Sequence, residues 1–319
     1  MTRLVAITGA TGFIGWHVAR RFREQGWQVR ALVRPESRGA VPDGVERRST
    51  RFERSPLGDA MHGAQLVVHL AAAIKARSPE NFARANVALT ADVARAAAGA
   101  GARLVHISSL AVTGPGQVTN PPGEDDPPRP IGDYGESKRQ SEMVVRGIAG
   151  LEWTILRPTL VYGPRDRLFL PIFRLGRRGI FVVPNSTASY NAVHVEDVAR
   201  AIELAGTCPG APGQTFFVGY PGHVTTTQML ATLAAIFHKP FRPIHIPHAL
   251  LRAVAEAGSL VSRLGLSFPL DRDRLRDIDT TGFVCRVDRA RERLGFSAAI
   301  GLAEGFAATA EWYRREGWI

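Results

Sequence analysis

Two polar side chains stand four residues apart in a segment with helical periodicity. Tyr134 and Lys138 form the pattern Y-x-x-x-K, which puts a phenol and an ammonium on one face of a helix. A phenol has an ordinary pKa of about 10, so proton transfer near neutrality requires a nearby cation that favours the phenolate. Lys138 supplies that charge. Ser109, at the end of an apolar run, is placed to hold a substrate oxygen in line with the phenol. These residues predict acid–base chemistry at a hydroxyl or carbonyl group.

The first glycine cluster of the chain has the spacing of a dinucleotide-binding loop. Residues 9–15 read Gly-Ala-Thr-Gly-Phe-Ile-Gly and lie between a strand-like run and an amphipathic segment. Gly9 permits a tight turn, Gly12 lets the backbone approach a pyrophosphate, and Gly15 lets the helix pack closely on the strand. The helix N-terminus would then face the phosphates. The alternative is a turn that serves packing alone.

The end of the second expected strand carries an arginine. Dinucleotide-binding folds that prefer NAD place an acid there, about 20 residues beyond the glycines, to hold the ribose hydroxyls. This chain has Arg34, followed by Ser37 and Arg38. A guanidinium matches phosphate oxygens, so the position favours NADP(H). NAD(H) stays possible, because arginine is frequent in this chain and Glu36 lies nearby.

Strands and helices alternate along the first half of the chain. Strand-like runs cover residues 4–7, 28–33, 65–70, 103–108 and 152–156, and amphipathic helices are expected at 13–25, 80–98 and 134–148. This alternation predicts an α/β fold with a Rossmann-type doubly wound parallel sheet. The proline-rich stretch 114–130 predicts a surface loop. Beyond residue 158 shorter helices, at 226–237, 247–257 and 302–316, predict a smaller, mostly helical C-terminal substrate lobe.

Composition places the chain among ordinary globular enzymes. It has 319 residues, of which 45% are hydrophobic and 22% are charged, enough to bury a large core. Two cysteines, Cys208 and Cys285, cannot form a disulfide framework, which indicates a reducing compartment. No signal peptide or transmembrane segment is evident, and we expect a cytoplasmic protein. The histidines show no metal-ligand spacing, so no metal site is predicted.

The net charge of +11 raises the question of an anionic partner. The cations are nearly all arginine and are scattered without a basic run, which argues against nucleic acid. A solvated surface is the simplest interpretation, and an anionic substrate or a membrane surface is the alternative. An apolar stripe could form core or pocket wall, a subunit contact, or a helix on a membrane surface. It comprises Leu250, Leu251, Val254, Leu260, Val261 and Leu264.

Taken together, the motifs resemble the extended short-chain dehydrogenases/reductases of the NAD-dependent epimerase/dehydratase type. The resemblance covers essentially the whole chain, with matches in order at residues 8–15, 69–72, 86, 108–109, 112–114, 134–138, 156–158, 161–164, 193–198, 294–296 and 311–313. It implies catalysis by Ser109, Tyr134 and Lys138, with the last two also contacting the cofactor. The other implied cofactor-binding residues are Gly9, Thr11, Gly12, Phe13, Ile14, Gly15, Arg34, Leu70, Ala71, Ala72, Asn86, Pro158 and Val161.

The same resemblance suggests how the chain is divided. Residues 1–161 would form the NADP-binding domain, to which residues 191–220 return. Residues 162–190 and 221–319 would form the substrate-binding lobe. We expect a homodimer that acts on a small-molecule substrate.

Two departures from the family pattern concern specificity. The stretch 49–52, where members usually carry an acid that reaches adenine, has none, so the adenine contact must come from elsewhere. Residues 190–192 lack the arginine with which sugar-nucleotide members often clamp a diphosphate. Both features resemble the hydroxysteroid-dehydrogenase and flavonoid-reductase side of the family. Aromatic and aliphatic side chains in the intervening segment are expected to offer apolar surface to the substrate, and the alternative is that they only pack the small lobe. They are Phe169, Ile172, Phe173, Phe181 and Tyr190.

The sequence thus predicts an NADP(H)-dependent oxidoreductase that interconverts a secondary alcohol and a ketone on a bulky, apolar substrate. The alternative enzyme is a sugar-nucleotide epimerase or dehydratase with tightly bound NAD. In that case arginines of the intervening segment, Arg165, Arg167, Arg174, Arg177 or Arg178, would replace the missing clamp. A cofactor-binding sensor without turnover is disfavoured, because it has no need of a phenol and an ammonium in register.

Overall fold

A seven-stranded sheet forms the centre of the protein. The structure, a computed structural model, describes residues 3–183, 188–263 and 282–319. All seven strands are parallel. Their order across the sheet is β11 (Thr215–Val218), β6 (Trp153–Pro158), β5 (Arg103–Ile107), β4 (Leu66–His69), β1 (Leu4–Thr8), β2 (Gln28–Val33) and β3 (Glu46–Ser49).

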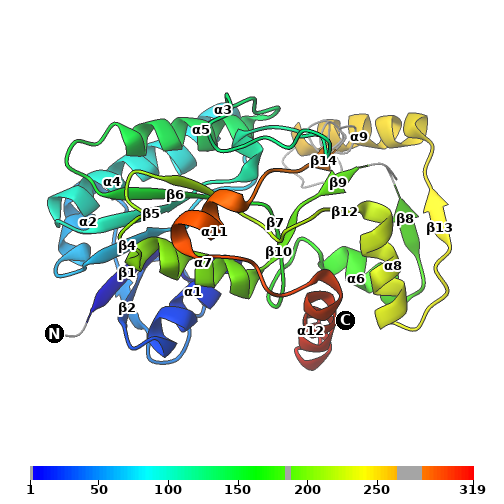
Figure 1. Ribbon diagram of the computed structural model, residues 1–319, viewed down its shortest axis with the longest axis horizontal. Coiled ribbons are helices and arrows are strands. Elements are labelled where there is room, and N and C mark those ends of the chain that lie inside the picture. Colours follow the sequence, from blue (N-terminus) through cyan, green and yellow to red (C-terminus); the bar gives the residue numbers. More distant parts are fainter. Residues whose placement is uncertain (1–2, 184–187, 264–281) are drawn as a thin grey trace.

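Helices cover both faces of this sheet (Figure 1). On one face lie α1 (Phe13–Glu24), α7 (Val195–Thr207) and α11 (Asp288–Leu294), whose apolar sides share a core with the sheet. On the other face lie α2 (Arg54–Met61), α4 (Leu89–Gly99) and α5 (Asp133–Arg146), around a second core. The central strands are buried on both sides and therefore consist almost wholly of apolar residues. The predicted α/β fold with a Rossmann-type doubly wound sheet is confirmed.

Parallel pairing brings the functional segments to one edge of the sheet. Thr8 pairs with His69, and His69 pairs with His106, so the last residues of β1, β4 and β5 are nearly level. The chain turns from β1 toward β2 on one side, and β4 lies on the other side of β1. In open α/β sheets the crevice at such a reversal of strand order is where ligands bind. The glycine loop lies at this point.

A smaller lobe follows the sheet in the chain. It contains α6 (Leu170–Arg177), α8 (Thr226–Ile236), α9 (His248–Arg263) and α12 (Leu302–Arg315). Three small sheets accompany these helices. They pair β7 (Leu160–Tyr162) with β10 (Ala192–His194), β8 (Phe181–Val183) with β13 (Pro243–His245), and β9 (Ser189–Tyr190) with β12 (Val224–Thr225) and β14 (Gly282–Phe283).

The core of the lobe is aromatic, and this corrects one expectation. Phe169, Phe173 and Phe181 pack with other apolar side chains in a single cluster and are buried. Phe173 contacts Tyr313 edge-to-face, with ring centroids 5.1 Å apart. These three phenylalanines therefore stabilise the lobe. The prediction that they offer apolar surface to a substrate is wrong. Ile172 is exposed and Tyr190 is half-buried.

Several elements differ from the predicted ones. The helix expected at 80–98 consists of α3 (Pro79–Phe82), a π-helical turn η1 (Ala83–Ala88) and α4. Strand β3 and helix α2 were not predicted. The loop at 114–130, which lies between η2 (Leu110–Val112) and α5, was predicted to lie on the surface. Much of it does, but Glu124 is buried, and its carboxylate accepts a 3.0 Å hydrogen bond from the Phe217 backbone N–H of β11.

The C-terminal segment returns to the sheet once more. Residues 288–298, which the sequence assigned to the substrate lobe, contribute Ala290, Leu294 and Phe296 to the core beneath the sheet. The remaining domain boundaries stay a prediction.

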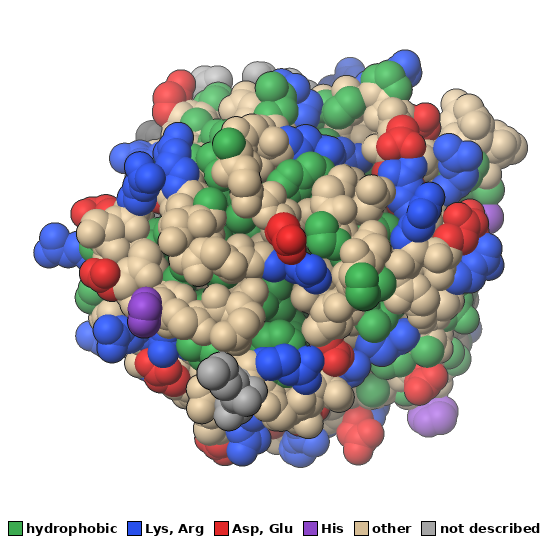
Figure 2. Space-filling model, turned by 60° about the vertical axis from the view of Figure 1, so that its left-hand side comes forward, with side chains coloured by type: hydrophobic (Ala, Val, Ile, Leu, Met, Phe, Trp, Pro, Cys, Tyr) green, Lys and Arg blue, Asp and Glu red, His purple; other side chains and the backbone are tan. Residues whose placement is uncertain are grey.

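Surface features were also predicted. In the apolar stripe, Leu251 is buried, Leu250 and Val254 are exposed, and Leu260, Val261 and Leu264 lie outside the residues whose side chains are described. No helix in the described ranges has the length and apolarity to span a membrane. On the face shown in Figure 2, cationic and anionic side chains are interspersed.

Candidate active site

The glycine loop after β1 is shaped by close backbone contacts. Gly9 has a φ of 75°, and a Cβ at this position would lie 2.8 Å from the Ala71 backbone nitrogen. A Cβ on Gly15 would lie 2.1 Å from the Gly9 carbonyl oxygen. Only glycine fits both positions. Gly12, which donates a 2.9 Å hydrogen bond to the Gly9 carbonyl, precedes α1 and leaves the N–H groups of its first turn, at Phe13 and Ile14, at the sheet edge. This loop fits a pyrophosphate.

The loop that carries Arg34 folds back against the glycine loop. A Cβ on Gly39 would lie 2.6 Å from the Thr11 Cβ, so the two loops are in contact. The Arg34 side chain is exposed and lies 3.5 Å from the Glu36 carboxylate. Sequence reasoning missed Arg47 of β3, whose guanidinium donates to the Gly39 carbonyl (2.7 Å) and to the Ser37 carbonyl. Arg47 thereby fixes the backbone of the arginine-bearing loop.

A third segment, after β4, is held by Asn86. The Asn86 amide accepts a hydrogen bond from the Ala73 N–H at 2.7 Å and donates one to the Ala73 carbonyl at 2.9 Å. It also donates to the Ser137 hydroxyl of α5 at 2.9 Å. Asn86 lies within the π-helical turn, an irregularity that is frequent at functional sites. It therefore ties the segment containing Leu70, Ala71 and Ala72 to the helix that carries Tyr134.

Tyr134 and Ser109 meet at the carboxyl end of β5. Tyr134 lies in the first turn of α5 and is half-buried, with its ring 6.3 Å from that of Phe82. Burial raises the pKa of the phenol, and a hydrogen bond with the Ser109 side chain partly offsets this effect. The Ser109 hydroxyl also accepts a 3.2 Å hydrogen bond from the Ala111 N–H, which fixes its position at the start of η2.

Lys138 is buried one turn further along α5. Its ammonium donates a 2.6 Å hydrogen bond to the Ile107 carbonyl of β5. Burial lowers the pKa of Lys138 to about 8. We expected Lys138 to lower the pKa of Tyr134, but in this structure burial and Ser109 set that pKa, and its net direction is upward. The three predicted catalytic residues are nevertheless brought together, because α5 contacts the Ile107 carbonyl through Lys138 and the Ser109 side chain through Tyr134.

A further contact, absent from the sequence prediction, lies one more turn along the same helix face. Glu142 accepts a 2.5 Å hydrogen bond from the Ser108 hydroxyl. Its carboxylate also binds the Arg157 guanidinium through two hydrogen bonds of 2.8 and 2.7 Å. Both charged side chains are buried. The spacing of Tyr134, Lys138 and Glu142, each four residues apart, was the available signal for this residue.

The Arg157 contact extends to the rest of the protein. Arg157 also donates to the Glu124 carbonyl at 3.4 Å, and the Glu124 carboxylate lies 3.6 Å from Arg289 of α11. Burial raises the pKa of Glu124, although the Phe217 N–H and Arg289 oppose the effect. A chain of polar contacts thus joins α11 to the residue that precedes Ser109.

Two histidines lie beneath the site. His69 and His106 stack with ring centroids 5.4 Å apart. His69 hydrogen-bonds Thr8 (2.7 Å) and Thr90 (3.0 Å), and His106 hydrogen-bonds Ser141 (3.0 Å). Burial, with a smaller contribution from Lys138, lowers the pKa of His69 to about 3 and that of His106 well below its ordinary value. Both rings are therefore neutral at ordinary pH.

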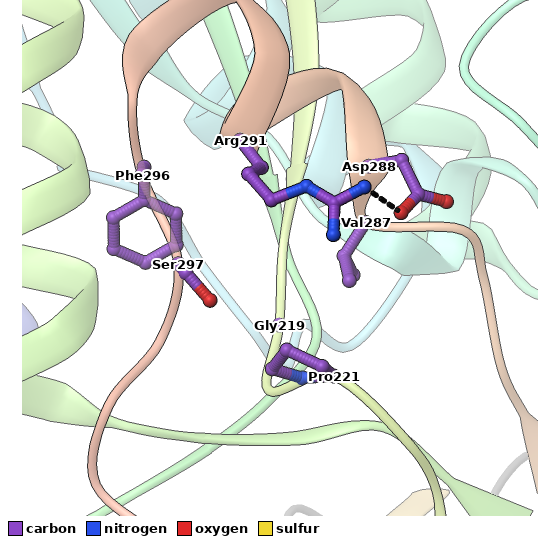
Figure 3. A pocket seen from close by; sticks show the side chains of 7 residues that line it. All are labelled: Gly219, Pro221, Val287, Asp288, Arg291, Phe296 and Ser297. Carbon is purple, nitrogen blue, oxygen red and sulfur yellow. Dashed lines mark hydrogen bonds and ion pairs between the residues drawn. The ribbon is translucent and has the colours of Figure 1, made fainter.

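The other predicted cofactor residues line the neighbouring strand end. Pro158 ends β6 and is buried beside Val218 of β11, whereas Val161 of β7 is half-buried and pairs with Val193. Within the described ranges, no group of three His, Cys, Asp or Glu side chains could hold a metal ion. Figure 3 shows a small cavity elsewhere, between the turn after β11 and α11, with the 3.1 Å Asp288–Arg291 ion pair in its lining. Its volume of about 40 Å³ is too small for a dinucleotide.

The chain is similar to known proteins over nearly its whole length. Residues 5–219 match the model of the NAD dependent epimerase/dehydratase family. The chain is 30% identical to ceramide reductase of Caulobacter vibrioides, covering 99% of this chain and 96% of that protein. It is also 30% identical to sterol demethylase protein B of Methylococcus capsulatus, covering the full length of both. Among solved structures, MoeE5 in complex with UDP-glucuronic acid and NAD is similar, with a TM-score of 0.76, 28% identity, and coverage of 98% of this chain and 99% of that one.

Proposed function

Since this chain belongs to the NAD-dependent epimerase/dehydratase family and is an NAD(P)-dependent enzyme of the extended short-chain dehydrogenase/reductase type, we propose that it interconverts a secondary alcohol and a ketone on a bulky, apolar substrate. The observation that carries this proposal is the contact of Tyr134 with Ser109, beside Lys138 and at the same end of the sheet as the glycine loop. This arrangement places an acid–base group where the cofactor edge of the sheet opens.

Each residue has a distinct role in the proposed reaction. The nicotinamide, when bound, supplies or accepts the hydride. The Tyr134 phenol gives a proton to the carbonyl oxygen or takes one from the hydroxyl. The Ser109 hydroxyl holds that same oxygen in line with the phenol. The Lys138 ammonium, held by the Ile107 carbonyl, provides positive charge that favours the phenolate when the phenol has given up its proton.

The cofactor would be held by the three loops at the sheet edge. Gly9, Thr11, Gly12, Phe13, Ile14 and Gly15 would face the pyrophosphate. Leu70, Ala71, Ala72 and Asn86 would line the adenosine side, and Pro158 and Val161 the nicotinamide side. Arg34 follows β2 and is exposed, 3.5 Å from the similarly exposed Glu36 carboxylate, and its guanidinium at this position supports a preference for NADP(H).

Two observations support an apolar substrate. Ceramide reductase and sterol demethylase protein B are named for lipids. At the position where sugar-nucleotide members often have an arginine, this chain has the buried Asn191. Its side chain is engaged by backbone groups: it accepts a 2.7 Å hydrogen bond from the Cys285 N–H and donates one to the Tyr220 carbonyl at 3.3 Å. Asn191 therefore holds β9, β14 and the turn after β11 together.

The second candidate is a sugar-nucleotide epimerase or dehydratase with tightly bound NAD. The similarity to MoeE5, solved with UDP-glucuronic acid and NAD, favours it. The homodimer and the cytoplasmic location stay predictions.

The proposal is tested with purified protein and a panel of hydroxy- and ketosterols, ceramide-like ketones and UDP-glucose, followed by nicotinamide absorbance. We expect NADPH oxidation with an apolar ketone. In Tyr134→Phe, kcat should fall by at least about 100-fold while NADPH affinity is kept. Micromolar UDP binding without turnover of any ketone would favour the epimerase instead. Turnover near the parent rate in Tyr134→Phe would refute the assigned acid–base role.

A further inference from the structure

Helix α6 and the turns on either side of it expose an unusual combination of side chains. In the segment 165–180, which we call the α6 segment, the aliphatic residues Leu168, Ile172, Leu175 and Ile180 are exposed, Leu168 to 49%. Ile172 and Leu175 lie one turn apart on the same side of α6, and the Ile180 N–H donates to the Leu175 carbonyl at 3.0 Å. These side chains therefore form one apolar surface at the C-terminal end of the helix.

The same segment is strongly cationic toward solvent. It carries five arginines, Arg165, Arg167, Arg174, Arg177 and Arg178, and a single acidic residue, Asp166. Asp166 is buried and accepts hydrogen bonds from the N–H groups of Leu168 and Phe169 at 2.8 and 3.1 Å, so it stabilises the turn before α6 and does not face solvent. Lys239 adds to the charge, because its side chain lies within 3.7 Å of the position that a Cβ on Gly179 would occupy.

These arginines lack carboxylate partners in the described part of the chain. Where the structure describes ion pairs, none involves them. Arg165 lies over the Trp16 ring at 4.5 Å and Arg167 over the Trp318 ring at 5.2 Å. Arg174 donates to the Trp318 carbonyl at 2.9 Å. Glu316 acts on Arg165 only at longer range. Contacts with Trp16 and Trp318 thus hold Arg165, Arg167 and Arg174 in place, and within the described ranges no carboxylate forms an ion pair with them.

The position of two of these arginines argues against a role as substrate clamp. Arg167 and Arg174 lie against Trp318, which follows α12, whereas Tyr134 begins α5. Figure 1 shows α12 and α5 on opposite sides of the molecule. The two arginines therefore lie on the opposite side of the molecule from the helix that carries Tyr134.

A second copy of this chain is a poor partner for the α6 segment. A two-fold contact presents the same patch from both subunits, so arginines would face arginines. A surface with dense negative charge and an apolar interior is complementary to cations flanking exposed aliphatic side chains. The half-buried indoles of Trp312 and Trp318 lie beside the same arginines, and tryptophan is favoured at the boundary of water and lipid. We propose that the α6 segment docks the protein reversibly on an anionic lipid bilayer.

The test is flotation of the full-length protein with vesicles of phosphatidylcholine containing about 30% phosphatidylglycerol, compared with phosphatidylcholine alone. We expect binding to the anionic vesicles only, with a strong decrease when salt is raised to about 0.5 M, since screening weakens exposed charge interactions. The triple variant Arg174→Gln/Arg177→Gln/Arg178→Gln should bind at least about tenfold more weakly. Ile172→Ser/Leu175→Ser should also lose affinity while the salt dependence remains.

A matched control has the same change in net charge elsewhere. Arg23→Gln/Arg54→Gln/Arg95→Gln removes three exposed arginines from α1, α2 and α4 and should bind vesicles like the parent. Thermal unfolding checks that each variant folds. Absence of parental binding, equal binding to uncharged vesicles, or an equal loss in the control would each overturn the proposal. So would a change in oligomeric size in the patch variant, which would assign the surface to a second copy, or a loss of UDP affinity, which would assign it to a diphosphate.

Discussion

The Ser108 hydroxyl donates a 2.5 Å hydrogen bond to Glu142, two helical turns beyond Tyr134 on α5. Three side chains of this helix therefore contact three consecutive residues at the end of β5. Lys138 binds the Ile107 carbonyl. Glu142 binds Ser108, and Tyr134 contacts Ser109. The distance between the phenol and the Ser109 hydroxyl depends on this set of contacts. Arg157, with two hydrogen bonds to Glu142, holds the outermost of them.

We predict that Glu142→Gln lowers both the free energy of unfolding and kcat. The substitution leaves the buried Arg157 guanidinium without its counter-charge, which typically costs about 3–5 kcal/mol. Urea unfolding measures that loss, and kcat should decrease more than KM changes. In the double variant Glu142→Leu/Arg157→Met, stability should recover, because an apolar pair removes the uncompensated charge. Recovery of kcat along with stability would show that the pair does not position Ser109.

Arg34→Ala should separate the two cofactors. Loss of a charge-assisted hydrogen bond to the 2′-phosphate weakens NADPH binding by about 1.5–3 kcal/mol and leaves NADH nearly unchanged. Fluorescence titration of both cofactors provides the comparison. Arg47→Ala should show the same selectivity to a smaller extent, since Arg47 holds the loop backbone at Gly39. Equal losses for both cofactors would indicate a general structural role for Arg34.

The low pKa of Lys138 gives a pH limit. Burial lowers it to about 8, so the ammonium is lost as pH rises through about 8, and kcat should fall above this pH. The sign for stability is opposite: between pH 8 and 10.5 the unfolded chain binds the proton and the folded chain does not, so stability increases with pH in that window. Lys138→Met should abolish turnover. At pH 7 it should increase the free energy of unfolding by up to about 3 kcal/mol. An unchanged stability–pH curve in this variant would contradict the assignment.

Acid should destabilise the protein through the stacked histidines. The folded-state pKa of His69 is about 3 against an ordinary value of 6.5, and that of His106 is lowered as well. As pH falls below 6.5, the two histidines become protonated in the unfolded chain but stay neutral in the folded chain. The free energy of unfolding therefore decreases by up to about 1.4 kcal/mol per pH unit for each ring. His106→Gln keeps an amide near Ser141 and should halve the slope between pH 6.5 and 5. Chemical unfolding at several pH values measures this slope. A slope equal to that of the parent protein would show that His106 does not contribute to the loss of stability in acid.

Gly15→Ala should abolish cofactor binding. A Cβ at this position would lie 2.1 Å from the Gly9 carbonyl oxygen, so α1 must move away from the loop and the N–H groups of its first turn would lose their position. Gly58→Ala on α2 is the control, because no atom lies within 4 Å of its Cβ; this substitution should stabilise the protein by up to about 1 kcal/mol. NADPH titration and thermal unfolding of both variants decide between these outcomes, and normal NADPH affinity in Gly15→Ala would contradict the assigned role of the loop.

The elements that the sequence predicted well have strong local signals. The glycine loop has positions that only glycine can occupy, the central strands have continuous apolar runs, and the structure has both at the expected residues. Strand β3 was missed because all of its residues are exposed, so it has no apolar pattern. Glu142 was missed because a charged helical residue usually faces solvent, and only the packing of α5 on β5 and β6 buries it. The prediction that the aromatic residues of the lobe contact the substrate was wrong for a related reason. A sequence does not distinguish apolar side chains that line a pocket from those that fill a core.

The chain passes between the sheet and the lobe several times. After β6 it enters the lobe, returns with α7 and β11, leaves again for α8 and α9, returns with α11, and ends with α12 in the lobe. No single cut separates the part that holds the nucleotide from the part that selects the substrate. A chimaera that joins the N-terminal half of one relative to the C-terminal half of another would divide both the sheet domain and the lobe. The reason is that β11, an edge strand of the sheet, comes from the C-terminal half of the chain. Recombination between relatives must therefore exchange several matched segments together, whereas specificity can change readily by substitutions within the lobe.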